Sequence, residues 1–419
     1  MEKALLVSVQ IKTDKGHWRI EDISSELEEL VSSTSVEIIE NIICVCEKPT
    51  ANYFIGSGKV QEISLIANDE NVDTVIFSHD LSGTQQRNLE REIGKKTIDR
   101  TQLILDIFAQ RARSPEGKMQ VELAQLQYLL PRLSGRGILL SNLGGGVGTR
   151  GPGETKLEFD RRQIRKKISK LKENLRNFRQ HRLTMHKRRK SNNLPSVVLV
   201  GYTSAGKSTL INALTDATQA ISEKLFTTLD PLSKSLQLES GQNIIISDTV
   251  GFLHELPHNL VEAFKATLEE VLDADLLIHV LDVYDHRLYQ HNQAVYDLLA
   301  QLGSADKPMI TALNKIDLVE DRTWLMVTKK DFNNSVLISA KTKENLEALV
   351  TLIEEYFSGL LMNVKLLIPH KRMELVDFFY RNAKINKIDY LEYGVRINLS
   401  LTKQFLDKIR KDKEIKIIC

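Results

Sequence analysis

The sequence has few cysteines, and their number argues against a disulfide-linked scaffold. Cys44, Cys46 and Cys419 are the only three in 419 residues. So low a number is typical of a protein that works in a reducing cytosol. Cys44 and Cys46 lie two positions apart in an apolar run, where a strand would place both on one face. We therefore expect buried thiols there rather than a metal-binding pair.

Long apolar runs are absent as well. No stretch approaches the about 20 apolar residues that a membrane-spanning helix needs. The first residues lack the basic start and apolar core of a secretory signal. We therefore expect no transmembrane segment and a cytoplasmic location. Hydrophobic residues still make up 42% of the chain, enough for true cores, and the length predicts about two to four domains.

The net charge of only +2 hides a strongly basic segment. Residues 156–190 contain fifteen Lys or Arg against three Asp or Glu, which gives +12 there and leaves −10 for the rest. Concentrated positive charge is the electrostatic footprint of nucleic-acid binding, although a solvated helix face gives the same composition. The predicted RNA contacts are Arg150, Arg161, Arg162 and Arg165.

Residues 201–208 fit the phosphate-binding pattern G-x-x-x-x-G-K-[ST]. A strand-like apolar run precedes them and a helix-like run follows, which is the context this loop needs. Backbone N–H groups and the helix N-terminus would face an anion. Lys207 would reach the outer phosphates, and Ser208 would hold Mg²⁺. The predicted loop contacts are Gly201, Tyr202, Thr203, Ser204, Ala205, Gly206, Lys207 and Ser208.

A second motif selects guanine over adenine. The run Asn314, Lys315, Ile316 and Asp317 follows a strand-like segment, and ligands bind at the carboxyl ends of parallel strands. The Asp317 carboxylate can accept hydrogen bonds from both N1–H and the 2-amino group of guanine. Adenine lacks this donor pair, so a buried Asp317 would reject it. Ser339, Ala340 and Lys341 follow another strand and are predicted to close over the base.

Two further motifs lie between these. The first switch loop is predicted at Phe226, Thr227, Thr228, Leu229 and Asp230. Thr228 would join Ser208 on Mg²⁺.

The other motif is Asp248, Thr249, Val250 and Gly251, after a strand-like run. Asp248 would lie behind the Mg²⁺ ligands, and the Gly251 N–H would meet the γ-phosphate of GTP, the substrate. Lys207, Thr228 and Gly251 are the predicted catalytic groups.

The residue after Gly251 is Phe252, where many small GTPases carry a glutamine that orients the attacking water. Phenylalanine cannot orient water, so the isolated protein is expected to hydrolyse GTP slowly and to need a partner. A purely structural role for Phe252 in the core is compatible with this.

The predicted fold class is α/β with four domains. Residues 1–112 alternate strand-like and helix-like stretches and predict an N-terminal α/β domain. Residues 113–193 predict a long antiparallel helical pair with a glycine-rich tip and a basic linker. Residues 194–362 predict a Ras-like P-loop GTPase domain, and residues 363–419 a small C-terminal α/β domain built from a strand–helix–strand set.

One further motif matches a zinc-protease pattern, but the residues within it do not suit a zinc site. Residues 254–258 match the zinc-protease pattern H-E-x-x-H. That chemistry needs one continuous helix, and Pro257 would break it. We expect no zinc site.

Taken together, these motifs resemble the HflX family of GTPases in the Obg–HflX group. The likeness covers nearly all of the chain and is weakest after about residue 364. The stretches that carry it are residues 53–60, 99–108, 148–154, 201–203, 226–231 and 248–252. The family usually has asparagine where this chain has Ser204. In related potassium-stimulated GTPases that asparagine helps to hold the monovalent ion. Serine is shorter, so the resemblance does not carry potassium stimulation over.

The resemblance implies binding to the large ribosomal subunit, with the helical pair and its tip near the peptidyl-transferase RNA. It also implies a role in splitting or rescuing stalled ribosomes or in ribosome biogenesis, hydrolysis stimulated by the subunit, and a secondary use of ATP. We also expect a monomer. Two alternatives stay open: an RNA-binding assembly factor that uses GTP as an occupancy switch, and a GTPase that regulates a membrane protease from the membrane periphery.

Overall fold

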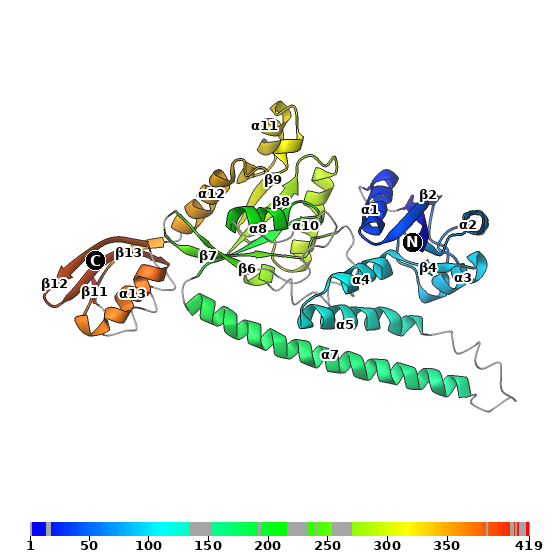
Figure 1. The fold of residues 1–419 in the computed structure, drawn as a ribbon, viewed down its shortest axis with the longest axis horizontal. Coiled ribbons are helices and arrows are strands. Elements are labelled where there is room, and N and C mark those ends of the chain that lie inside the picture. Colours follow the sequence, from blue (N-terminus) through cyan, green and yellow to red (C-terminus); the bar gives the residue numbers. More distant parts are fainter. Residues whose placement is uncertain are drawn as a thin grey trace. The chain divides into compact units, whose positions relative to one another are not determined.

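The computed structural model (Figure 1) describes residues 2–13, 18–133, 152–191, 194–215, 233–239, 241–253, 270–359, 361–382, 384–402, 406, 409 and 416–418. The chain divides into two compact units, one formed mainly by Met1–Phe178 and the other by most of the chain from Arg179 to Cys419. Within the described ranges, no helix combines the length and the hydrophobicity that crossing a membrane requires.

The first unit begins with a parallel α/β fold, as predicted. Its sheet has the strand order β2-β1-β3-β4, and each neighbouring pair is parallel. Parallel neighbours need crossover connections, which α1, α2 and α3 provide. Apolar residues such as Leu5, Ile63 and Leu89 form a common buried core. The elements are β1 (Glu2–Ile11), α1 (Ile20–Ser32), β2 (Val36–Cys46), α2 (Ser57–Asp69), β3 (Thr74–Phe77), α3 (Gly83–Ile93), β4 (Lys96–Ile98) and α4 (Arg100–Arg111). Cys44 on β2 is buried and Cys46 partly buried, both as free thiols.

Two long helices follow, α5 (Pro115–Arg132) and α7 (Pro152–Ser191). Within the first unit they lie side by side and run in opposite directions (Figure 1). Lys167 of α7 forms an ion pair with Glu122 of α5. Leu123 of α5 and Leu171 of α7 are buried, whereas Phe178 of α7 is exposed. We attribute the exposure of Phe178 to helix length, because α7 has 40 residues and α5, with 18, is too short to cover all of it.

The second unit contains the predicted P-loop fold. Its sheet has the order β10-β9-β8-β5-β7-β6, parallel throughout except for the pair β6 and β7. The chain leaves β5 for β7 on one side and later returns to β8 on the other, which creates a topological switch point beside β5. The strands are β5 (Ser196–Val200), β6 (Ser233–Gln237), β7 (Asn243–Asp248), β8 (Leu276–Asp282), β9 (Met309–Asn314) and β10 (Ser335–Leu337).

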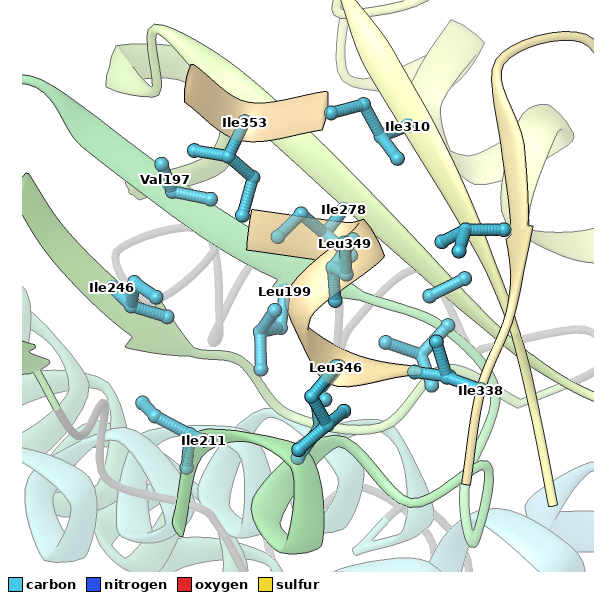
Figure 2. Close-up of a cluster of buried hydrophobic side chains, with 14 of the residues drawn as sticks. Val197, Leu199, Ile211, Ile246, Ile278, Ile310, Ile338, Leu346, Leu349 and Ile353 are labelled. Atoms are coloured by element: carbon cyan, nitrogen blue, oxygen red, sulfur yellow. The ribbon is translucent and has the colours of Figure 1, made fainter. Parts of the chain in front are cut away.

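Helices cover both faces of this sheet. The helical elements are α8 (Lys207–Thr215), α10 (Leu288–Gln301), the 3-10 turn η1 (Ile316–Leu318), α11 (Thr323–Lys330) and α12 (Leu346–Gly359). The helix α10 covers one face of the sheet, where the ring of Tyr296 contacts the ring of His279 on β8. The helices α8 and α12 cover the other face. Figure 2 shows the core in which the strands meet α8 and α12, and its labelled residues are Val197, Leu199, Ile211, Ile246, Ile278, Ile310, Ile338, Leu346, Leu349 and Ile353.

The last part of the chain forms a four-stranded antiparallel sheet in the order β12-β13-β11-β14, with α13 packed against it. The sequence predicted only a strand–helix–strand set here, and it missed the hairpin that β12 and β13 form in the structure. Its turn holds Glu392 and Tyr393, neither of which is a strong turn signal. The elements are β11 (Leu361–Ile368), the 3-10 turn η2 (His370–Arg372), α13 (Met373–Asn382), β12 (Lys384–Leu391), β13 (Gly394–Thr402) and β14 (Lys416–Ile418).

Candidate nucleotide-binding site

The predicted phosphate-binding loop leaves the end of β5 at Val200 and enters α8 at Lys207. Gly206 has φ +96°, and a Cβ atom there would lie 2.3 Å from Asn314 Nδ2. A Cβ atom at Gly201 would lie 2.3 Å from a carbonyl oxygen of β8. Both positions therefore require glycine. The loop leads directly into the N-terminus of α8, and helix N-termini favour anions.

Lys207 is buried at the start of α8. Its Nζ donates to the carbonyl oxygens of Gly201 at 2.9 Å and Tyr202 at 2.8 Å. Burial lowers the pKa of Lys207 to about 8, and the negative charge of Asp248 opposes this effect. The ammonium group is thus held by the loop itself, next to the place where a phosphate would bind.

Ser208 and Asp248 bring two oxygen donors together. Ser208 Oγ donates to Asp248 Oδ2 at 2.7 Å. Asp248 ends β7 and is fully buried, so its carboxylate is fixed. A hydroxyl beside a carboxylate is a hard oxygen set of the kind that Mg²⁺ prefers, and these residues fit that ion.

The segment that follows Asp248 packs directly on the loop. Thr249 Oγ1 donates to the Leu199 carbonyl at 2.7 Å. A Cβ atom at Gly251 would lie 2.8 Å from Thr203 Cγ2, so glycine is required here too. Phe252 is 1% exposed and belongs to the core, as its apolar side chain requires.

Asn314 connects three motifs through one side chain. Its Nδ2 donates to the carbonyl of Ala205 at 2.8 Å, and its Oδ1 accepts from the backbone N–H of Ala340 at 2.9 Å. The 314–317 motif, the phosphate-binding loop and the 339–341 motif are thereby held at fixed positions relative to one another.

The Asp317 carboxylate is oriented by its neighbours. Ser339 Oγ donates to Asp317 Oδ1 at 2.6 Å, and Ser339 is fully buried. Lys315 has a left-handed backbone, with φ +69°, and its Nζ lies 2.6 Å from Asp282 Oδ2. Lys341 is exposed. Asp317 is partly buried, and the hydrogen bond from Ser339 fixes the orientation of its carboxylate.

The structure brings four of the five predicted motifs together at the carboxyl ends of β5, β7, β9 and β10: residues 201–208, 248–251, 314–317 and 339–341. The first switch loop, with Phe226, Thr227, Thr228, Leu229 and Asp230, lies outside the described residues. Arg150 and residues 254–258 lie outside them as well.

The predicted RNA contacts Arg161, Arg162 and Arg165 lie on α7 in the other unit, and the last two are exposed. Ser204 is exposed with φ +59°. Asp282, the partner of Lys315, was not among the predicted residues, although its place at the end of an apolar strand could have identified it.

Comparison with known proteins identifies the family to which the chain belongs. Successive parts of the chain match families described as "GTP-binding GTPase N-terminal" (residues 21–109), "GTP-binding GTPase Middle Region" (111–189), "50S ribosome-binding GTPase" (196–315) and "HflX C-terminal domain" (325–412). The curated GTPase HflX of Caldanaerobacter subterraneus subsp. tengcongensis is 43% identical over 98% of this chain and 93% of its own length. This chain belongs to the HflX family of GTPases.

A second HflX relative, from Escherichia coli, is 39% identical over 99% of this chain and 96% of its own length. Among solved structures, a GTP-binding protein from Sulfolobus solfataricus in complex with GDP is 25% identical. The match covers 86% of this chain and all of that protein, with a TM-score of 0.44. The four family matches and the two HflX relatives confirm the resemblance to HflX and the P-loop GTPase assignment.

Proposed function

We propose that this HflX-family GTPase binds the large ribosomal subunit, hydrolyses GTP there, and splits or rescues stalled ribosomes or acts in ribosome biogenesis. The observation that carries the proposal is the presence, in one chain, of the match to a 50S ribosome-binding GTPase family and of a 40-residue helix that includes the +12 segment. RNA is a polyanion, and clustered Lys and Arg bind it by releasing its counterions.

The nucleotide would bind across the switch point beside β5. The loop N–H groups and Lys207 would contact the phosphates. Asp317 would accept from guanine, with Ser339 orienting its carboxylate through the 2.6 Å hydrogen bond. Ala340 and Lys341 would cover the base. These roles follow from the positions of the side chains and from the chemistry of GTP.

Ser208 and Thr228 are the residues that would hold Mg²⁺, with Asp248 behind them. The ion, when bound, would neutralise charge on the β- and γ-phosphate oxygens. The 2.7 Å contact between Ser208 and Asp248 supports this assignment, because it already places the hydroxyl and the carboxylate together.

Hydrolysis transfers the γ-phosphoryl group to water. The bond from the γ-phosphorus to the bridging oxygen breaks, a bond to water oxygen forms, and GDP and phosphate leave. Lys207 and the Gly251 N–H would stabilise the charge on the transferred group. Phe252 has no atom that accepts a proton and is buried in the core. The chain alone should therefore be slow, and the ribosomal partner would complete the site.

The subunit would be contacted by the basic face of α7, including Arg161, Arg162 and Arg165, and by the tip with Arg150. The finer expectations stay predictions: the domain limits 1–112, 113–193, 194–362 and 363–419, a monomeric state and a cytoplasmic location.

Co-sedimentation with purified large subunits tests the contact. The triple variant R161E/R162E/R165E should bind subunits at least about tenfold more weakly than the wild type, while its GTP affinity stays unchanged. The matched control reverses three exposed charges elsewhere in the first unit, Lys12, Lys48 and Arg91, and should bind nearly normally. If the wild type fails to sediment with subunits, the proposed function is wrong. If the wild type binds subunits and the triple variant binds them equally well, the basic face of α7 is not the contact.

A further inference from the structure

Tyr202, the second residue of the phosphate-binding loop, has a main chain that is held from three sides. Its carbonyl oxygen accepts from Lys207 Nζ at 2.8 Å. On either side of it, the N–H of Phe252 donates to the Gly201 carbonyl at 3.1 Å and the N–H of Thr203 donates to the Phe252 carbonyl at 2.9 Å. The orientation of this short stretch of backbone therefore decides where the Lys207 ammonium lies.

The ring of Tyr202 stacks on the imidazole ring of His291 in α10. The ring centroids are 3.8 Å apart and the planes differ by only 11°. The two residues are 4% and 5% exposed, respectively. Because two flat rings in such close contact cannot shift independently, the position of His291 constrains that of Tyr202.

His291 is itself fixed from the loop between β8 and α10. Its backbone N–H donates to the Arg287 carbonyl at 2.8 Å, and its Nδ1 lies 3.8 Å from Asp285 Oδ2. Arg287 holds that carboxylate through Nη2 at 2.9 Å and Nε at 3.0 Å. Burial tends to raise the pKa of Asp285, but the hydrogen bonds from Arg287 prevail and hold it below its usual range.

We infer that His291 is a positioning residue for GTP binding, which acts on Lys207 through the stacked ring and the main chain of Tyr202. His291 lies outside all five sequence motifs. The stacking contact, rather than the contact with Asp285, carries this role, because the ring of Tyr202 is the part that connects to the loop. The inference rests on the GTPase site alone and is independent of the ribosomal partner.

Three variants of the full-length chain separate the ring from the ion contact. His291→Leu removes the flat ring, and His291→Phe keeps a flat ring but cannot pair with Asp285. The control is His286→Leu, since His286 also lies near Asp285, at 3.6 Å, but its side chain is 63% exposed. The readouts are the Kd of a fluorescent GTP analogue, KM and kcat for GTP, and the Tm of the nucleotide-free protein.

His291→Leu should raise Kd and KM between about twofold and about tenfold, the range expected for one stacked pair. His291→Phe should restore both values, and His286→Leu should match the wild type. Unchanged Kd in His291→Leu, or a His291→Phe variant as weak as His291→Leu, overturns the inference. If His291→Leu does not fold, His291→Asn takes its place against His291→Phe, with the same two outcomes.

Discussion

Asn314 and Ala205 are joined by a buried hydrogen bond of 2.8 Å, from the side-chain amide to the main-chain carbonyl, across 109 residues of sequence. The same side chain accepts from the N–H of Ala340. One amide thus ties the predicted base-binding side of the site to its phosphate-binding side. A change that displaces Asn314 should therefore affect both ends of the nucleotide.

Gly206→Ala is the smallest such change. The new Cβ atom would lie 2.3 Å from Asn314 Nδ2, at φ +96°. Gly303 offers a matched control, because it has φ +71° with nothing within 4 Å of an added Cβ atom. Both variants should lose about 1–2 kcal/mol of unfolding free energy to backbone strain. Only Gly206→Ala should also lose GTP binding, as measured by titration with a fluorescent analogue. Equal GTP affinity in the two variants would show that the contact with Asn314 is unimportant.

Asp317→Asn should change base specificity. Asparagine cannot accept from both N1–H and the 2-amino group of guanine, but its N–H can donate to the C2 carbonyl of xanthine. GTP affinity should fall by about a hundredfold or more, and xanthosine triphosphate should bind better than it does to the wild type. Competition binding with both nucleotides checks this, with exposed Asp306→Asn as control. Retained GTP preference would refute the assignment of Asp317 to guanine.

Lys207 should make stability depend on pH in a definite direction. Its pKa is lowered from 10.5 to about 8 by burial. Between these values the unfolded chain binds more protons at this site than the folded one, so stability rises with pH through that window. The full effect corresponds to about 3 kcal/mol. Lys207→Met removes it. The Tm of the nucleotide-free wild type, relative to that variant, should therefore rise from about pH 7.5 to about pH 9.5, and parallel curves would contradict the argument.

Arg132 should stabilise the junction between α5 and the N-terminal fold. Asp99 is fully buried and accepts from Arg132 Nη2 and from Tyr128 OH, both at 2.9 Å. Arg132→Met leaves this carboxylate without its cation, which should cost about 3–5 kcal/mol in urea unfolding. Exposed Arg91→Met should cost little. Similar losses in both variants would mean that the buried ion pair contributes nothing specific.

Much of the fold was predictable because apolar periodicity and the glycine motifs act locally. The strand before Gly201 and the helix after it lie where the pattern places them, at Ser196–Val200 and Lys207–Thr215. The β12–β13 hairpin was not predictable in this way, because its register depends on the pairing of β13 with β11 and there is no turn signal at Glu392 and Tyr393.

The site was predictable only as far as its motifs extend. Asn314 and Asp317 follow from residue type and spacing, but the bond from Asn314 to Ala205 depends on the tertiary fold. His291 could not be identified from the sequence, since stacking on Tyr202 requires α10 to pack beside the loop, and no spacing rule connects the two residues.

The central claim is that a ribosomal partner completes a slow GTPase. Single-turnover hydrolysis of radiolabelled GTP, measured with and without purified large ribosomal subunits, tests it most directly. Lys207→Ala, assayed alongside, should show no hydrolysis in either condition and so excludes a contaminating enzyme. The account predicts slow hydrolysis by the chain alone and at least about a tenfold acceleration by the subunit. Subunits that bind the protein and leave the rate unchanged would contradict it.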